Sequence, residues 1–167
     1  MSGLSSEIIK HLYDGPKYTI DDIFNLFKKD DEQKIKRAIK DLKQQEFIKQ
    51  KQDYDGSVII SLSEKGRLRA LNLAFRRFEN KREIWDGKWR MVSFDIPNSS
   101  VKGRKALAYR LKTGGFYKLQ ESLFLYPYDC KKEINALVHF FKIEKYVRFG
   151  IIESIDNQDS MIHHFKL

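Results

Sequence analysis

Cysteine is almost absent from this sequence: Cys130 is the single thiol among 167 residues. One cysteine cannot form a disulfide within the chain, and with no second cysteine near it Cys130 cannot begin a zinc knuckle. It also has no nearby histidine in the sequence that could activate it as a nucleophile. These absences exclude a disulfide-stabilised domain and a zinc finger.

Long hydrophobic runs are also missing. The longest, such as Val58-Ile59-Ile60, are far shorter than the ~20 residues that cross a bilayer. Residues 1–7 lack the basic and then hydrophobic pattern of a signal peptide. We therefore expect a cytoplasmic protein without a membrane partner. Its 41% of hydrophobic residues are enough to build real cores.

Acidic residues are outnumbered, with 23 Asp+Glu against 32 Lys+Arg and a formal net charge of +9. The excess is concentrated locally, because residues 102–118 contain six basic residues and no acidic one. Such a balance favours an anionic partner, and double-stranded DNA is the partner we expect. For residues 102–112 two interpretations stay open, nucleic-acid contact and a merely solubilising surface.

The first half of the chain is predicted to contain three helices and a β-hairpin. Ser5 or Ser6 is expected to cap a helix over residues 7–13, Thr19 to cap the second helix, and Asp30 or Asp31 to open the third. Two strand-like segments then flank the Asp55-Gly56 turn. Three helices followed by a hairpin are typical of a winged helix-turn-helix.

The third helix has two different faces. At 100° per residue, one sector holds the apolar residues Ile35, Ala38, Ile39 and Leu42, and the opposite sector holds Gln33, Arg37, Lys40 and Gln44, with no carboxylate. Arginine can pair with guanine, glutamine with adenine, and lysine with phosphate. The alternative is a solvated helix face. We predict DNA contacts from Gln33, Lys36, Arg37, Lys40, Lys43 and Gln44 on the helix, and from Lys49, Lys51 and Tyr54 on the wing.

The second half alternates strands and helices. The predicted order is a strand at 89–95, a helix at 101–113, strands at 116–120 and 122–126, a helix at 131–141 and a strand at 146–153. This βαββαβ order is that of a ferredoxin-like domain. Trp85-Asp86-Gly87-Lys88 marks the boundary, giving domains 1–84 and 85–167 and an α+β fold class. Residues 154–167 are expected to add an edge strand or a short helix.

Several residues of the second half carry a resemblance: Phe94-Asp95-Ile96-Pro97, Arg104, Leu111, Gly115-Phe116 and the run 120–124. They resemble the ferredoxin-like protein that partners the spacer integrase in CRISPR adaptation. The preceding winged helix and the run Tyr126-Pro127-Tyr128-Asp129 make the whole chain similar to the PaaX family of repressors. That resemblance implies a transcriptional repressor that binds DNA as a homodimer and requires no cofactor. It leaves open which small-molecule effector, if any, it responds to.

Asp95 has two interpretations. In the CRISPR-associated family an aspartate at this position faces its twin across a dimer axis and is thought to hold a divalent ion. That resemblance implies a catalytic and metal-binding Asp95 with Mg²⁺ or Mn²⁺, in a nuclease or a CRISPR adaptation subunit. Judged from the residues alone, Asp95 is a turn-forming acceptor before Ile96-Pro97, and no second carboxylate lies near it in sequence. We favour the regulator, which needs no enzymatic activity.

Overall fold

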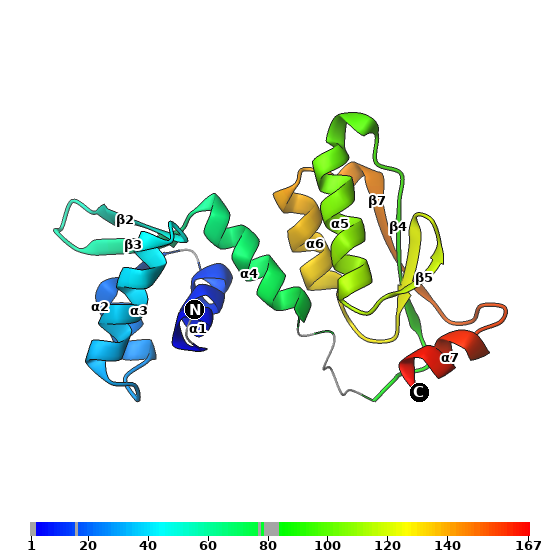
Figure 1. Cartoon of the computed structure of the whole chain (residues 1–167), viewed down its shortest axis with the longest axis horizontal. Helices are drawn as coiled ribbons and strands as arrows, with labels where there is room; N and C mark the ends of the chain where they lie inside the picture. The colour runs from blue at the N-terminus through cyan, green and yellow to red at the C-terminus, as the bar shows by residue number, and fades with distance from the viewer. Residues whose placement is uncertain (1–2, 16, 77, 79–83) are drawn as a thin grey trace. The chain divides into compact units, whose positions relative to one another are not determined.

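The computed structural model describes residues 3–15, 17–76, 78 and 84–167 (Figure 1). It is a mixed helix and sheet protein, as the α+β prediction requires. The chain divides into two compact units, Met1–Leu73 and Ala74–Leu167. Among the described residues, no helix is both long enough and apolar enough to span a bilayer.

The first unit contains the predicted helices and hairpin. Its elements are α1 (Gly3–Asp14), β1 (Tyr18–Thr19), α2 (Ile20–Leu26), α3 (Glu32–Gln44), β2 (Ile48–Gln52), β3 (Val58–Leu62) and most of α4 (Glu64–Arg76). The three strands form one antiparallel sheet in the order β1-β3-β2. The two-residue strand β1 has no counterpart in the sequence-based prediction.

The predicted start of the first helix was wrong. Helix α1 begins at Gly3, and Ser5 is a buried residue inside it with 1% of its surface exposed. Ser5 shares helical spacing with Ile8, Ile9 and Leu12, so it lies on the apolar face of α1. A serine near a helix start therefore belongs to the packed face here and does not mark the cap.

Helices α2 and α3 begin where the capping residues predict. The Thr19 hydroxyl accepts from the Asp22 amide at 3.1 Å, and the Thr19 amide donates to the Asp22 carboxylate at 2.7 Å. The hydrogen bonds that the Thr19 amide and hydroxyl donate to the Asp22 carboxylate lower its pKa. At the next helix the Asp31 carboxylate accepts from the Lys34 amide at 3.1 Å. The two caps fix the starts of α2 and α3.

Ser63 joins three elements of the first unit at the point where α4 leaves the hairpin. Its hydroxyl donates to the Glu46 carbonyl at 2.6 Å and accepts from the Gly66 amide at 3.0 Å. Its own amide donates to the Phe47 carbonyl at 3.0 Å. Gly66 lies so close to Phe47, the residue before β2, that a Cβ atom would come within 1.9 Å of the Phe47 carbonyl oxygen. The end of α3, the start of β2 and the first turn of α4 therefore share one serine.

The second unit contains one four-stranded sheet and three longer helices among its described residues. Its elements are β4 (Trp89–Phe94), the 3₁₀ turn η2 (Asn98–Ser100), α5 (Val101–Thr113), β5 (Tyr117–Gln120), β6 (Leu123–Tyr126), α6 (Lys131–Phe140), the 3₁₀ turn η3 (Glu144–Tyr146), β7 (Val147–Ile152) and α7 (Asp159–Phe165). The strand order is β5-β6-β4-β7, and every neighbouring pair is antiparallel. Helices α5 and α6 cover the same face of this sheet (Figure 1).

The carboxy-terminal segment forms the short helix α7, one of the two forms expected for it. Met161 of this helix is buried with Trp89 and Leu125. Because side chains alternate along a strand, Trp89 and Met91 lie on the opposite face of β4 from Val92 and Phe94. Helix α7 therefore covers part of the second face of the sheet.

The division between the units falls at Leu73 and Ala74, whereas the sequence predicted a boundary at 84 and 85. The aromatic residue Phe78 explains the difference. Its ring centroid lies 5.3 Å from that of Tyr126 and 5.7 Å from that of Phe116, and the Tyr126 hydroxyl donates to the Phe78 carbonyl at 3.0 Å. Phe78, which follows α4 in the sequence and precedes the Asp-Gly turn, thus packs with the second core.

Arg90 ties the start of β4 to two neighbouring segments. Its guanidinium donates to both carboxylate oxygens of Asp86, at 2.6 and 2.7 Å, and to the Pro127 carbonyl at 2.8 Å. This pairing with Arg90 lowers the pKa of Asp86 to about 2. The Asp86 turn is therefore a structural part of the second unit.

Replacing Gly66 by alanine should destabilise the first unit. The added methyl group would overlap the Phe47 carbonyl, so α4 or β2 must move, and overpacking of this kind typically costs about 1–3 kcal/mol. Urea unfolding followed by circular dichroism measures the change. Gly3→Ala is the matched control, because no atom lies within 4 Å of its Cβ position, and it should change stability by less than about 0.5 kcal/mol. Equal stability of the two variants would contradict the close approach of Gly66 to the Phe47 carbonyl.

The Asp86–Arg90 pair should contribute stability that disappears in acid. The folded-state pKa of Asp86, about 2, lies below its ordinary value of 3.8, so the contribution is complete above pH 4 and is lost as the pH falls from 4 to 2. The native protein should therefore exceed Asp86→Asn in stability at neutral pH, and the difference should vanish near pH 2. Asp156→Asn removes an exposed carboxylate from the same unit and controls for charge. A difference that stays constant down to pH 2 would refute the ion pair.

Candidate nucleic-acid interface

The two faces of α3 are arranged as the sequence predicts. Its apolar residues Ile35, Ala38, Ile39 and Leu42 are buried in the core of the first unit. On the other side, the four residues of the predicted strip, Gln33, Arg37, Lys40 and Gln44, are all exposed, as are Lys36 and Lys43. Burial of one face fixes the rotation of the helix and leaves the polar strip available to a partner.

Helix α3 carries five basic and two acidic side chains. One acid, Glu32, forms an ion pair with Lys36, whose ammonium group also lies 6.0 Å from the centroid of the Phe24 ring. Within the described part of the chain, no carboxylate pairs with Arg37 or Lys40. These two side chains therefore retain a positive charge that an anion can neutralise.

The β2–β3 hairpin supplies the wing residues. Lys49 and Lys51 are exposed on β2, and Tyr54 is fully exposed at the tip. The tip also contains Asp53 and Asp55, which would repel a phosphate group. The wing can therefore approach a nucleic acid through the Tyr54 ring and the two strand lysines.

The acidic residues of the tip hold the turn together. Asp55 accepts from the Ser57 amide at 2.9 Å, and hydrogen bonds from Ser57 lower the pKa of Asp55. Gly56 has φ +85°, in the left-handed region where glycine carries no steric penalty. The Asp55-Gly56 turn predicted from the sequence is confirmed.

Asp95 lies at the end of β4 with an exposed side chain, and its backbone amide donates to the Tyr146 carbonyl at 2.9 Å. Among the described residues, no group of three or more His, Cys, Asp or Glu side chains is placed to hold a metal ion. One carboxylate is too few for a Mg²⁺ or Mn²⁺ site, so the residues of a single chain do not fit the ion.

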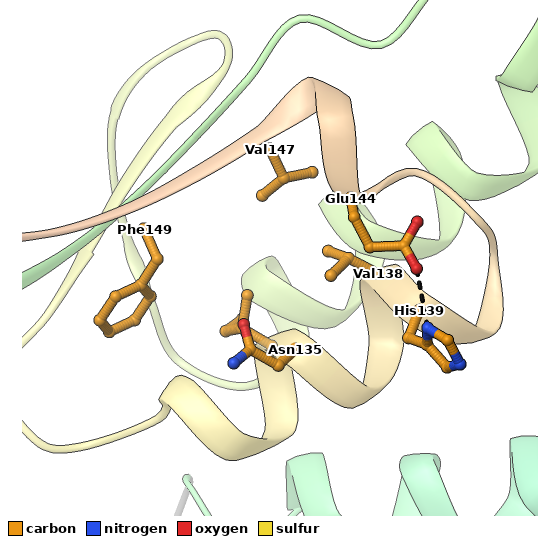
Figure 2. A pocket seen from close by; sticks show the side chains of 7 residues that line it. Asn135, Val138, His139, Glu144, Val147 and Phe149 are labelled. Atoms are coloured by element: carbon orange, nitrogen blue, oxygen red, sulfur yellow. Dashed lines mark hydrogen bonds and ion pairs between the residues drawn. The ribbon is translucent and has the colours of Figure 1, made fainter.

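A pocket of about 390 Å³ opens beside α6 in the second unit (Figure 2). Its lining residues are Ile134, Asn135, Val138, His139, Glu144, Val147 and Phe149. His139 Nδ1 lies 2.8 Å from Glu144 Oε1 at one end, and the Phe149 ring lies at the other (Figure 2). The polar groups are confined to one end and to Asn135, so the pocket does not present a catalytic constellation.

One exposed residue of the second unit escaped the sequence analysis. Tyr109 on α5 has 65% of its surface exposed. An aromatic residue in an amphipathic helix is usually placed in the core, and no sequence signal other than its position among lysines sets Tyr109 apart. Tyr109 lies on the basic helix for which the sequence allows two interpretations, nucleic-acid contact and a solubilising surface.

Comparison with known families gives a match in the second half of the chain. Residues 82–161 match the model of the PaaX protein central Cas2-like domain. No sequence among the curated proteins matches the chain. The match covers the whole four-stranded sheet together with α5 and α6, which is the region where the resemblance was noted. Residues 82–161 are therefore a domain similar to the PaaX protein central Cas2-like domain, and they make up 80 of the 167 residues of the chain.

Proposed function

We propose that this PaaX-like protein is a DNA-binding transcriptional repressor. The first unit is a winged helix-turn-helix whose α3 enters the major groove of an operator. The second unit is a ferredoxin-like domain through which two copies form a homodimer. The observation that carries the proposal is the division of α3 into a fully buried apolar face and an exposed polar strip without a carboxylate.

The layout of the first unit supports DNA recognition. Two capped helices, α2 and α3, are joined by a short turn, and the hairpin follows directly after α3. In helix-turn-helix proteins the second helix of the pair contacts base edges and the first crosses the backbone. Arg37 and Gln44 have the side-chain chemistry that distinguishes guanine and adenine in the major groove.

The layout of the second unit supports dimerisation. Its element order β4-α5-β5-β6-α6-β7 is the βαββαβ order of the ferredoxin-like domain. The sheet ends at β5 and at β7, and strand edges of this kind are surfaces on which a second chain can pair. A two-fold dimer would place two copies of α3 on half-sites one helical turn, about 34–36 Å, or a multiple of it apart.

Selection of genomic DNA fragments by the purified protein tests this proposal. At near-physiological salt, and in EDTA to suppress any metal-dependent cleavage, we expect enrichment of a few sites with two-fold symmetric half-sites. The spacing between half-sites then reports the dimer geometry. Uniform recovery of all fragments would contradict sequence recognition by α3.

Arg37→Ala should weaken binding to the selected operator by about 1–3 kcal/mol and relax the preference at one base pair, because Arg37 is expected to form a direct base contact. Fluorescence anisotropy with operator and scrambled duplexes measures both effects. Lys17→Ala is the control, since Lys17 is an exposed cation of the same unit outside the strip. An equal loss on both duplexes would assign Arg37 to a phosphate contact.

The metal-dependent nuclease is the rival function, and it depends on Asp95 from two copies meeting at a dimer axis. It predicts Mg²⁺- or Mn²⁺-dependent cleavage of DNA that Asp95→Ala abolishes while operator affinity stays unchanged. A gel-based cleavage assay on the purified native and variant proteins decides between the functions. The repressor proposal expects the native protein to leave DNA intact, or any residual cleavage to be the same in Asp95→Ala.

A further inference from the structure

The outer face of α5 carries three lysines and a tyrosine. Lys102, Lys105, Tyr109 and Lys112 follow one another at intervals of three, four and three residues, so they lie on one side of the helix. All four side chains are exposed, and 65% of the Tyr109 surface is accessible. This set of four is called the α5 face below.

Nothing acidic balances the α5 face locally. Residues 102–118 include no aspartate or glutamate, and none of the described carboxylates pairs with its three lysines. Two other exposed lysines of the same unit do have acidic partners. Lys88 pairs with Glu153 at 2.9 Å and Lys118 with Glu121 at 2.6 Å. A surface that served solubility alone would be expected to mix both signs in the same way.

Arg110 adds positive charge on the side of α5 that faces α6. Its residue surface is only 7% exposed, and its guanidinium carbon lies 5.9 Å from the centroid of the Phe141 ring. Its Nη1 atom donates to the Ala106 carbonyl of the same helix at 3.1 Å, and its Nε atom has no partner among the described residues. Burial lowers the pKa of Arg110, and no described carboxylate offsets its charge. Helix α5 is therefore positive on its flank as well as on its outer face.

We propose that the α5 face binds the sugar-phosphate backbone of double-stranded DNA. This inference rests on the proposed function and extends it, because it gives the second unit a DNA contact of its own. Lysine ammonium groups bind phosphate as point charges, and a tyrosine hydroxyl can donate to a phosphate oxygen. The face contains no residue pair that distinguishes one base pair from another. Its contribution is therefore the same for every sequence.

The length of the α5 face suits this partner. Lys102 and Lys112 are separated by about 15 Å along the helix axis. Over that distance a DNA duplex presents about nine phosphates on its two strands together. Three lysines can therefore each meet a different phosphate, and each contact should add about 0.9 to the slope of log affinity against log salt.

Anisotropy titrations of the full-length protein between 50 and 250 mM salt test the proposal. The test variant is Lys102→Gln, Lys105→Gln and Lys112→Gln combined. The control combines Lys142→Gln, Lys145→Gln and Lys166→Gln, which removes three exposed charges from the same unit outside α5. We expect the test variant to bind operator and scrambled duplexes more weakly by the same factor, about 10- to 100-fold at 150 mM salt. Its salt slope should be smaller by up to about 2.7 for each bound copy of the chain. The matching lysine-to-arginine variant should bind like the native protein.

The outcomes distinguish the two proposals. Equal affinities and slopes for the test and control variants would overturn the role of the α5 face. If Arg37→Ala still weakened operator binding in that case, the proposed function would stand. Loss of binding in the test variant, with no effect of Arg37→Ala, would support the α5 face and refute base recognition by α3. An effect confined to single-stranded RNA would overturn the assignment to duplex DNA, and absence of DNA binding by the native protein at 50 mM salt would overturn both proposals.

Discussion

The arrangement of the first unit depends on Ser63. Its hydroxyl group bridges the Glu46 carbonyl at the end of α3 and the Gly66 amide in α4, while its backbone amide binds the start of the wing. A hydroxyl that donates and accepts at once can satisfy a helix start and a helix end in the same place. Because α3 and the hairpin share this anchor, the hydrogen bonds of Ser63 fix their relative orientation. The exposed residues of α3 and of the wing can then act as one surface.

Several acidic side chains of this protein accept hydrogen bonds from other residues of the chain. Asp22 and Asp31 cap helices, Asp55 shapes the wing turn, and Asp86 holds Arg90. Each of these carboxylates is held by neighbouring donors. The net charge of +9 is an average over the whole chain, and it therefore understates how positive the surfaces of α3 and α5 are. Helices α3 and α5 keep most of their cations without a described acidic partner, and these are the surfaces where a polyanion gains the most.

Sequence patterns predicted most of the elements, because their signals are local. The 100° periodicity identified all four buried residues of α3, and Thr19 and Asp31 marked the helix starts. What the sequence could not show depends on distant contacts. Strand β1 is two residues long and exists only because β3 lies beside it, and Met161 is buried because α7 folds back onto Trp89 and Leu125. The exposure of Tyr109 is likewise a property of packing. The roles of the predicted DNA-contacting residues and of Asp95 stay predictions, since they concern partners outside the chain.

The two basic helices differ in chemistry, and this difference separates their roles. The α3 strip combines arginine and glutamine, whose paired hydrogen-bonding groups match the edges of particular bases. The α5 face offers lysines and a tyrosine hydroxyl, which bind phosphate equally well beside any base. Lysine contacts of this kind supply affinity that is common to all DNA sequences, so they lengthen the time spent on DNA without changing which site is preferred. The proposed repressor needs both properties, and the proposals assign them to different units of the chain.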